Sequence, residues 1–247
     1  MIETSTRAVR LGMLTPSSNT VLEPLTARML EGLPEVSAHF GRFAVTEISL
    51  GHQARGQFEI EPMLDAASLL ADARVGVICW NGTSAGWLGL DQDKRLCAAI
   101  EDRTGIPACS SVLALAEIFR MTGLRRFGLV TPYLDEIQTA IIRTFEKEGF
   151  ICPSERHLGD PGNFSFAEVS EETLCRMCRE VAKDGEVEAI TIFCTNLKGA
   201  AVVADMEAEL GLPIYDTIAT ALWSSLRKTS IDPKAVEGWG RLFQELP

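Results

Sequence analysis

The chain repeats part of its own pattern. The stretch RLGMLTPS, which begins at Arg10, has a counterpart in RFGLVTPY, which begins at Arg126. VGVICWNGT at residues 75–83 resembles VEAITIFCT at residues 187–195, and a Gly-hydrophobic-Pro tripeptide then follows in each half. Because the three matches occur in the same order and at similar offsets, they indicate two halves with one fold, related by a pseudo-twofold axis.

Each half alternates short apolar runs with amphipathic stretches. The apolar runs suit buried strands and occupy residues 10–14, 75–79, 127–130, 189–193 and 213–215. The amphipathic stretches are typical of helices and occupy residues 61–73, 113–121, 134–147 and 200–210. This alternation predicts an α/β fold with a parallel sheet in each half and the active site in the cleft between them. We expect the halves to be residues 1–115 and 116–225, with residues 226–247 as a tail returning to the N-terminal half.

The repeat also predicts where a ligand binds. In open parallel sheets ligands bind beyond the carboxyl ends of the strands, so the loops after equivalent strands would face each other across one cleft. The loop WNGTSAGW, residues 80–87, follows an apolar run and offers small and hydroxyl side chains that suit an anion. The repeat aligns Gly82 in this loop with Cys194, so one half contributes a thiol and the other contributes none.

The charge and composition of the chain argue against several kinds of partner. The formal net charge of −11 argues against nucleic acid or an anionic membrane as the main partner. No apolar run is long enough for a membrane span, and the N-terminal residues lack the apolar core of a signal peptide. Seven cysteines, an odd number, predict reduced thiols and a cytoplasmic protein. Cys175 and Cys178 fit the CxxC formula but lie in a charged helical pattern, so we interpret them as packing residues rather than metal ligands.

Short motifs give the chain a family resemblance. Its similarity to maleate cis–trans isomerase lies in GMLTPSSNT (12–20), VTPY (130–133), GNFSFAEV (162–169) and FCTN (193–196). Its similarity to arylmalonate decarboxylase lies in GTSAGW (82–87), TPYLDE (131–136) and GWGRLF (238–243). Both resemble the aspartate/glutamate racemase superfamily, and the similarity extends from about residue 10 to residue 243.

The resemblance implies an enzyme that uses no metal and no cofactor and acts on a small carboxylic acid. Racemases of the superfamily place one cysteine on each face of the substrate's α-carbon. Maleate isomerase resembles them in having both cysteines, whereas arylmalonate decarboxylase keeps only the second and has glycine in the first position. Gly82 and Cys194 match the decarboxylase pattern. Cys79 lies within an apolar strand, and we interpret it as a core residue.

The same resemblance indicates the residues of the site. The expected catalytic residues are Thr83, Ser84, Tyr133 and Cys194. The expected substrate-binding residues are Pro16, Asn19, Arg42, Gly82, Asn163 and Thr195. Asn19, Arg42 and Asn163 are isomerase-like, because they would hold a substrate carboxylate. Taken singly, such residues also have ordinary interpretations: a turn, a packing aromatic, a surface arginine or a small buried thiol.

The chemistry of decarboxylation fits these residues. Loss of CO₂ leaves an electron pair on the α-carbon, which can delocalise into a second carboxylate as an enediolate if donors surround its oxygens. The expected donors are the hydroxyl groups of Thr83, Ser84 and Tyr133 and the backbone N–H of Thr195. Cys194 could then protonate the carbanion from one side, and a helix starting after it could lower the pKa of its thiol.

We therefore expect a decarboxylase acting on a small substituted malonate or another dicarboxylic acid. One alternative is an isomerase or a one-thiol racemase, in which water or another group replaces the missing cysteine. Another is a carboxylate-binding protein without catalysis. A homo-oligomer is compatible with the sequence. If both loops face one α-carbon, Gly82→Cys should add racemase activity, unless a positive φ at Gly82 makes a side chain there unfavourable.

Overall fold

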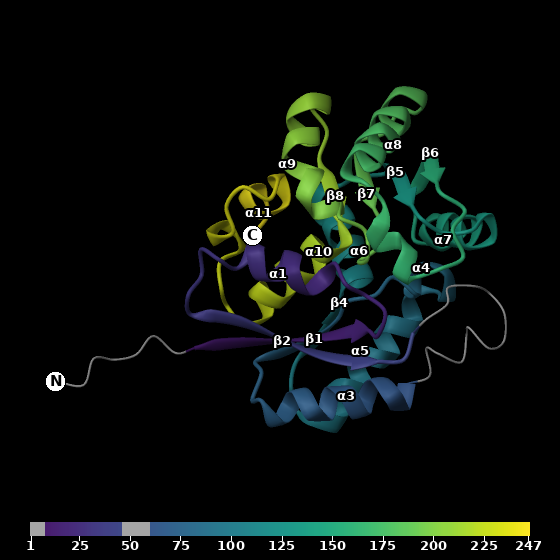
Figure 1. The fold of residues 1–247 in the computed structure, drawn as a ribbon. Coiled ribbons are helices and arrows are strands. Elements are labelled where there is room, and N and C mark those ends of the chain that lie inside the picture. Colours follow the sequence, from purple (N-terminus) through teal and green to yellow (C-terminus); the bar gives the residue numbers. More distant parts are fainter. Residues whose placement is uncertain (1–7, 46–59) are drawn as a thin grey trace.

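The chain forms two parallel sheets of four strands each (Figure 1). The computed structural model describes residues 8–45 and 60–247. The first sheet has the order β2-β1-β3-β4, with β1 (Val9–Pro16), β2 (Val36–Phe43), β3 (Val77–Trp80) and β4 (Ala108–Ser110). The second has the order β6-β5-β7-β8, with β5 (Arg126–Thr131), β6 (Ile151–His157), β7 (Ala189–Ile192) and β8 (Ile214–Asp216). The same order in both sheets confirms the predicted fold of two similar α/β halves.

Helices pack on both faces of each sheet. The first sheet lies between α3 (Ile60–Asp72) with α5 (Leu90–Thr104) and α1 (Leu22–Met29) with α10 (Thr217–Lys228). The second lies between α8 (Glu171–Asp184) with α9 (Gly199–Leu210) and α6 (Ser111–Thr122) with α7 (Asp135–Lys147). Short helices complete the fold: α4 (Ala85–Leu88), α11 (Arg241–Glu245) and the 3₁₀ turns Phe164–Glu168 and Pro233–Ala235. In the described residues, no helix has the length and apolar character needed to cross a membrane.

The sequence predicts the four central strands and the edge strand β8. All four residues of β3 and of β7 are buried, because helices cover both faces of each sheet, and such strands are continuous apolar runs in sequence. Three strands were not predicted. β2 and β6 are edge strands whose residues are mostly half-exposed, so polar side chains interrupt their apolar pattern. β4 has three residues, Ala-Cys-Ser, too few to show a pattern.

The two halves exchange a helix. α6 follows the first sheet but packs on the second, where the Phe119 ring lies 5.2 Å from the ring of Phe127 on β5. α10 follows the second sheet but packs on the first, where Ser225 Oγ lies 3.7 Å from the Sγ of Cys109 on β4. The two helices also contact each other, and Thr220 donates a hydrogen bond to a carbonyl at the start of α6. Each sheet therefore depends on a helix from the other half; the division at residues 115 and 225 stays a prediction.

We predict that Phe119→Ala destabilises the protein by about 3 to 5 kcal/mol, because it removes a fully buried ring that contacts four other aromatic rings. Urea unfolding followed by circular dichroism measures the change. Leu69→Ala on α3 is the matched control: its side chain is 72% exposed, so the expected change is within about 0.5 kcal/mol. Equal losses in the two variants would show that α6 does not anchor the second sheet.

Candidate active site

One small cavity lies where the carboxyl ends of the two sheets meet. It is lined by eight of the ten predicted site residues: Pro16, Gly82, Thr83, Ser84, Tyr133, Asn163, Cys194 and Thr195. Val45, Trp80 and Trp87 complete the lining. The cavity holds about 20 Å³, roughly the room for one water molecule. The repeat thus led to one shared cavity, while the role of each residue stays a prediction.

Cys194 lies two residues after the end of β7 and is 2% exposed. Its sulfur accepts a hydrogen bond of 3.4 Å from the backbone N–H of Asn196. Burial raises the pKa of the thiol to about 12, while the nearby Tyr133 hydroxyl and the Asn196 N–H lower it by less. The expectation that a helix would lower this pKa was wrong, because α9 begins only at Gly199. The group is therefore a protonated thiol at neutral pH, which suits a proton donor better than a nucleophile.

Tyr133 connects the thiol to the loop of the other half. Its hydroxyl lies 2.6 Å from the hydroxyl of Thr83. Burial raises the pKa of Tyr133 well above its usual value, so its hydroxyl also stays protonated. Trp87 and Phe166 contact the ring edge-on, with centroids 5.3 and 5.6 Å away, and hold it in place. Thr83, Tyr133 and Cys194 thus form a row of neutral proton donors along the cavity.

The loop of the first half is held by its backbone. The carbonyl of Gly82 accepts a hydrogen bond of 2.6 Å from the Ser111 hydroxyl at the start of α6. The carbonyl of Thr83 accepts one of 2.9 Å from the N–H of Gly86. Ser84 precedes α4, but its side chain makes no cap hydrogen bond to that helix. The interpretation of Ser84 as only a helix cap therefore has no support, and the residue lines the cavity.

Thr195 ties the loop of the second half to the first half. Its hydroxyl donates a hydrogen bond of 3.0 Å to the carbonyl of Asn81. Its own carbonyl accepts one of 2.9 Å from the side-chain amide of Asn19. Asn196 adds a second bridge, because its amide oxygen accepts from the N–H of Thr20 at 3.0 Å. These bonds fix the position of Cys194 relative to the loop that contains Gly82.

Two predicted substrate-binding residues do not line the cavity. The amide oxygen of Asn19 accepts hydrogen bonds from the N–H groups that begin α1, and its NH₂ group bonds to Thr195. Arg42 is exposed; it pairs with Glu23 at 2.6 Å and donates to the carbonyls of Ser17 and Asn19 at 2.9 Å each. In this arrangement both residues brace the loop after β1, and contact with a substrate stays a prediction.

Asn163 does line the cavity, and it also joins the two halves. Its side-chain NH₂ donates a hydrogen bond of 2.8 Å to the Ser18 hydroxyl. Its carbonyl accepts one of 2.6 Å from the amide of Asn196. Asn163 therefore has an anchoring role that the sequence did not indicate.

Sequence reasoning missed four residues that shape the site: Val45, Trp80, Trp87 and Asp216. Trp80 and Trp87 flank the loop that was singled out, yet neither was assigned to the site. Asp216, at the end of β8, is fully buried, and burial raises its pKa to about 7. Its Oδ1 caps α10, and its charge contributes to the raised pKa of Cys194. The repeat contained a signal for Asp216, because it follows the second Gly-Leu-Pro at the strand end next to β7.

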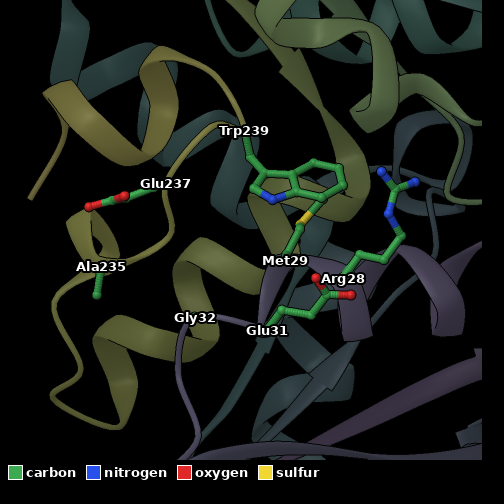
Figure 2. Close-up of a pocket in the computed structure, with 7 residues that line it drawn as sticks. All are labelled: Arg28, Met29, Glu31, Gly32, Ala235, Glu237 and Trp239. Carbon is green, nitrogen blue, oxygen red and sulfur yellow. The ribbon is translucent and has the colours of Figure 1, made fainter.

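A larger surface depression, about 400 Å³, lies elsewhere (Figure 2). It is formed by α1 and the C-terminal segment, and Figure 2 shows the Arg28 side chain beside the Trp239 ring. The guanidinium carbon of Arg28 lies 5.3 Å from the centre of that ring. The other lining residues are Met29, Glu31, Gly32, Ala235 and Glu237. This depression has no thiol or hydroxyl among its lining residues and is separate from the Cys194 cavity.

Most of the chain matches one family model. A profile of arylmalonate decarboxylase matches residues 21–243. The chain belongs to this family. Its resemblance to both branches, which the motifs predicted, is confirmed by relatives of both kinds.

Those relatives divide between two reactions. Over 237 residues the chain is 27% identical to arylmalonate decarboxylase from Bordetella bronchiseptica, covering 95% of this chain and 96% of that protein. Over 246 residues it is 28% identical to maleate isomerase from Nocardia farcinica, covering 96% of each. A solved Nocardia farcinica maleate cis–trans isomerase has the same fold, with a TM-score of 0.88, 24% identity and coverage of 97% of this chain and 99% of that one. It is a cysteine-to-serine variant with a covalently bound succinylcysteine intermediate.

We predict that iodoacetamide at neutral pH modifies Cys175 at least about ten times faster than Cys194, because the thiolate is the reactive form and Cys194 is buried with a raised pKa. Activity should persist while Cys175 is modified and disappear as Cys194 reacts. Peptide mapping by mass spectrometry gives both rates. If Cys194 reacted first, its thiol would be ionised and exposed, and it could not be the acid described above.

Proposed function

We propose that the protein is a cofactor-independent decarboxylase of a small substituted malonate or similar dicarboxylic acid. The observation that carries this proposal is the protonated thiol of Cys194, which faces the same cavity as the hydroxyl groups of Thr83, Ser84 and Tyr133. The glycine at position 82 supports it as well, because the site then holds a single thiol among its described lining residues.

The reaction breaks the bond between the α-carbon and one carboxylate. CO₂ leaves, and the electron pair stays on the α-carbon and delocalises into the second carboxylate as an enediolate. Hydroxyl donors around the oxygens of that carboxylate stabilise the developing charge. The Cys194 S–H then gives its proton to the α-carbon, and the thiolate that forms takes a proton from water. Since the proton comes from one side, the product is chiral when the two substituents differ.

The polarity of the cavity favours loss of a carboxylate. Pro16, Val45, Trp80 and Trp87 provide apolar walls, and the described lining contains no lysine, arginine or histidine. Arg42, which could have held a carboxylate, pairs with Glu23 outside the lining. A carboxylate against apolar side chains lacks the solvation that it has in water, whereas neutral CO₂ loses nothing there.

The rival reactions need groups that this site lacks or disfavours. The Nocardia farcinica isomerase structure contains a succinylcysteine, so a cysteine of that protein had bonded to the substrate. Such an addition needs a thiolate, and burial of Cys194 opposes that form. A racemase needs an acid or base on each face of the α-carbon, and position 82 is glycine. A carboxylate-binding protein without catalysis would leave the thiol without a role.

We predict that the protein converts at least one 2-substituted malonate to the monoacid with a single deuterium at the α-carbon when the reaction runs in D₂O. Proton NMR with a panel of malonates and maleate measures this directly. Cys194→Ala should lower the rate by about 10² to 10⁴-fold through loss of the acid. Tight binding without turnover, or conversion of maleate to fumarate as the main reaction, would contradict the proposal. So would full activity in Cys194→Ala.

We also predict that kcat/KM stays constant from about pH 7 to about pH 10 as far as Cys194 determines it. The acid form is the active form, and burial raises its pKa from the usual 9.0 to about 12, so it persists at alkaline pH. Rates measured across this pH range, with the substrate found in the NMR screen, test this. A rate that rises with pH through this range would mean that the thiolate is the active form.

A further inference from the structure

The glycine at position 82 is not required by its backbone. Gly82 does not have a positive φ, whereas Gly89 and Gly105 do. The strain of a positive φ, which would have argued against a side chain there, therefore does not apply. Another neighbour must explain why this position has no Cβ.

That neighbour is Trp80. A Cβ placed on Gly82 would lie 2.5 Å from Cε2 of the Trp80 indole and closer still to Cζ2 and Cη2. Real Cβ atoms do not approach other heavy atoms this closely, so a side chain at 82 requires the ring to move. The six-membered part of the indole therefore occupies the space that any side chain at 82 would take.

The indole is held in this position. Trp80 ends β3 and is 1% exposed. Its ring lies 5.2 Å from the ring of Phe43, which ends β2 on the far side of β1. The carbonyl of Gly82 is fixed by the Ser111 hydroxyl, so the loop cannot simply turn away from the ring. Displacing the ring would disturb a packed core rather than a flexible surface side chain.

We propose that Trp80 determines the specificity of the site: its indole covers the substrate face opposite Cys194 and takes the place of a second acid or base. This inference rests on the proposed function, because it concerns the same cavity. The repeat makes position 82 the counterpart of Cys194, and both positions line the cavity from different halves. Among the described lining residues, Trp80, Pro16 and Val45 have no acidic or basic side chain that could exchange a proton with the α-carbon.

The indole then has two effects on the reaction. It excludes water from one face of the planar enediolate, so the only proton that reaches the α-carbon comes from Cys194. It also prevents the reverse type of step, in which a base on that face removes the α-hydrogen as a proton while the C–H electron pair enters the carboxylate. With Trp80 in this position, the α-carbon is protonated only from the side of Cys194, whichever residue occupies position 82.

The earlier expectation for Gly82→Cys changes accordingly. Alone, this substitution should lower the melting temperature and add no racemase activity, because the new thiol and the indole compete for one space. Combined with Trp80→Leu, it should give a thiol on one face and Cys194 on the other. Leucine removes the six-membered ring while keeping an apolar contact for Phe43.

The test is a double-mutant cycle of wild type, Gly82→Cys, Trp80→Leu and the double variant. The comparison variant is Trp87→Leu with Gly82→Cys, which enlarges the same cavity at a side chain that supplies none of the three atoms nearest to a Cβ at 82. Melting temperature and iodoacetamide labelling report whether the new thiol has room. Exchange of the α-hydrogen of 2-phenylpropanoate and 2-methylbutanoate in D₂O, both hands of each, reports action on the second face.

We expect Trp80→Leu to lower the melting temperature in the wild-type background but to raise it in the Gly82→Cys background. The double variant should exchange the α-hydrogen at least ten-fold faster than either single variant, and the Trp87 control should not. A Gly82→Cys variant with wild-type melting temperature and rapid labelling would overturn the inference. So would a double variant that melts normally, is labelled at the new thiol and shows no exchange.

These measurements separate the two proposals. Melting and labelling need no substrate, so they locate the indole even if no malonate is decarboxylated. A wild type that decarboxylates malonates, beside a double variant without exchange, would leave the proposed function standing and remove the role of Trp80. If the wild type showed no turnover but the double variant exchanged the α-hydrogen, the proposed function would fall and the role of Trp80 would stand.

Discussion

The hydrogen bonds of Thr195 set the geometry on which the site depends. The hydroxyl of this residue holds a carbonyl of the first half, and its carbonyl is held by Asn19 of the first half. Since Cys194 is its direct neighbour, the thiol of one half cannot shift without breaking contacts with the other. The proposed chemistry needs such a constraint, because Thr83 and Ser84 come from the first half, whereas Tyr133 and the acid Cys194 come from the second.

The cavity works with neutral groups. Burial keeps both the Cys194 thiol and the Tyr133 hydroxyl protonated, and the described lining offers no cation to a bound anion. A dicarboxylate would therefore be held by hydrogen-bond donors on one side and face apolar walls on the other. In the proposed reaction, this division would give the two carboxylates different fates: one would be stabilised as the enediolate, and the other would lie where leaving as CO₂ is favourable.

Much of this could be predicted from the sequence, and the limits have physical causes. β1, β3, β5 and β7 are central strands, so their apolar runs are visible, and the repeat then brings Gly82 and Cys194 to one place. β2 could not be predicted, because its middle residues are partly exposed and polar side chains interrupt its apolar pattern. Phe43 lies on β2 and packs against Trp80. Because β2 was not predicted, the position of the indole could not be predicted either. The expected direction of the Cys194 pKa shift was wrong for a similar reason. This pKa depends on how deeply the thiol is buried and on where α9 begins, which are both tertiary features.

The exchange of α6 and α10 makes the two repeated halves depend on each other for their packing. If the chain arose by duplication of one half, the ancestral half must have paired with a second copy, because alone it would have lacked the helix that covers one face of its sheet. The fused chain keeps that mutual dependence within a single polypeptide. Each half was then free to diverge at its own strand end, one keeping a thiol and the other an indole beside a glycine, while neither could be lost without unfolding its partner.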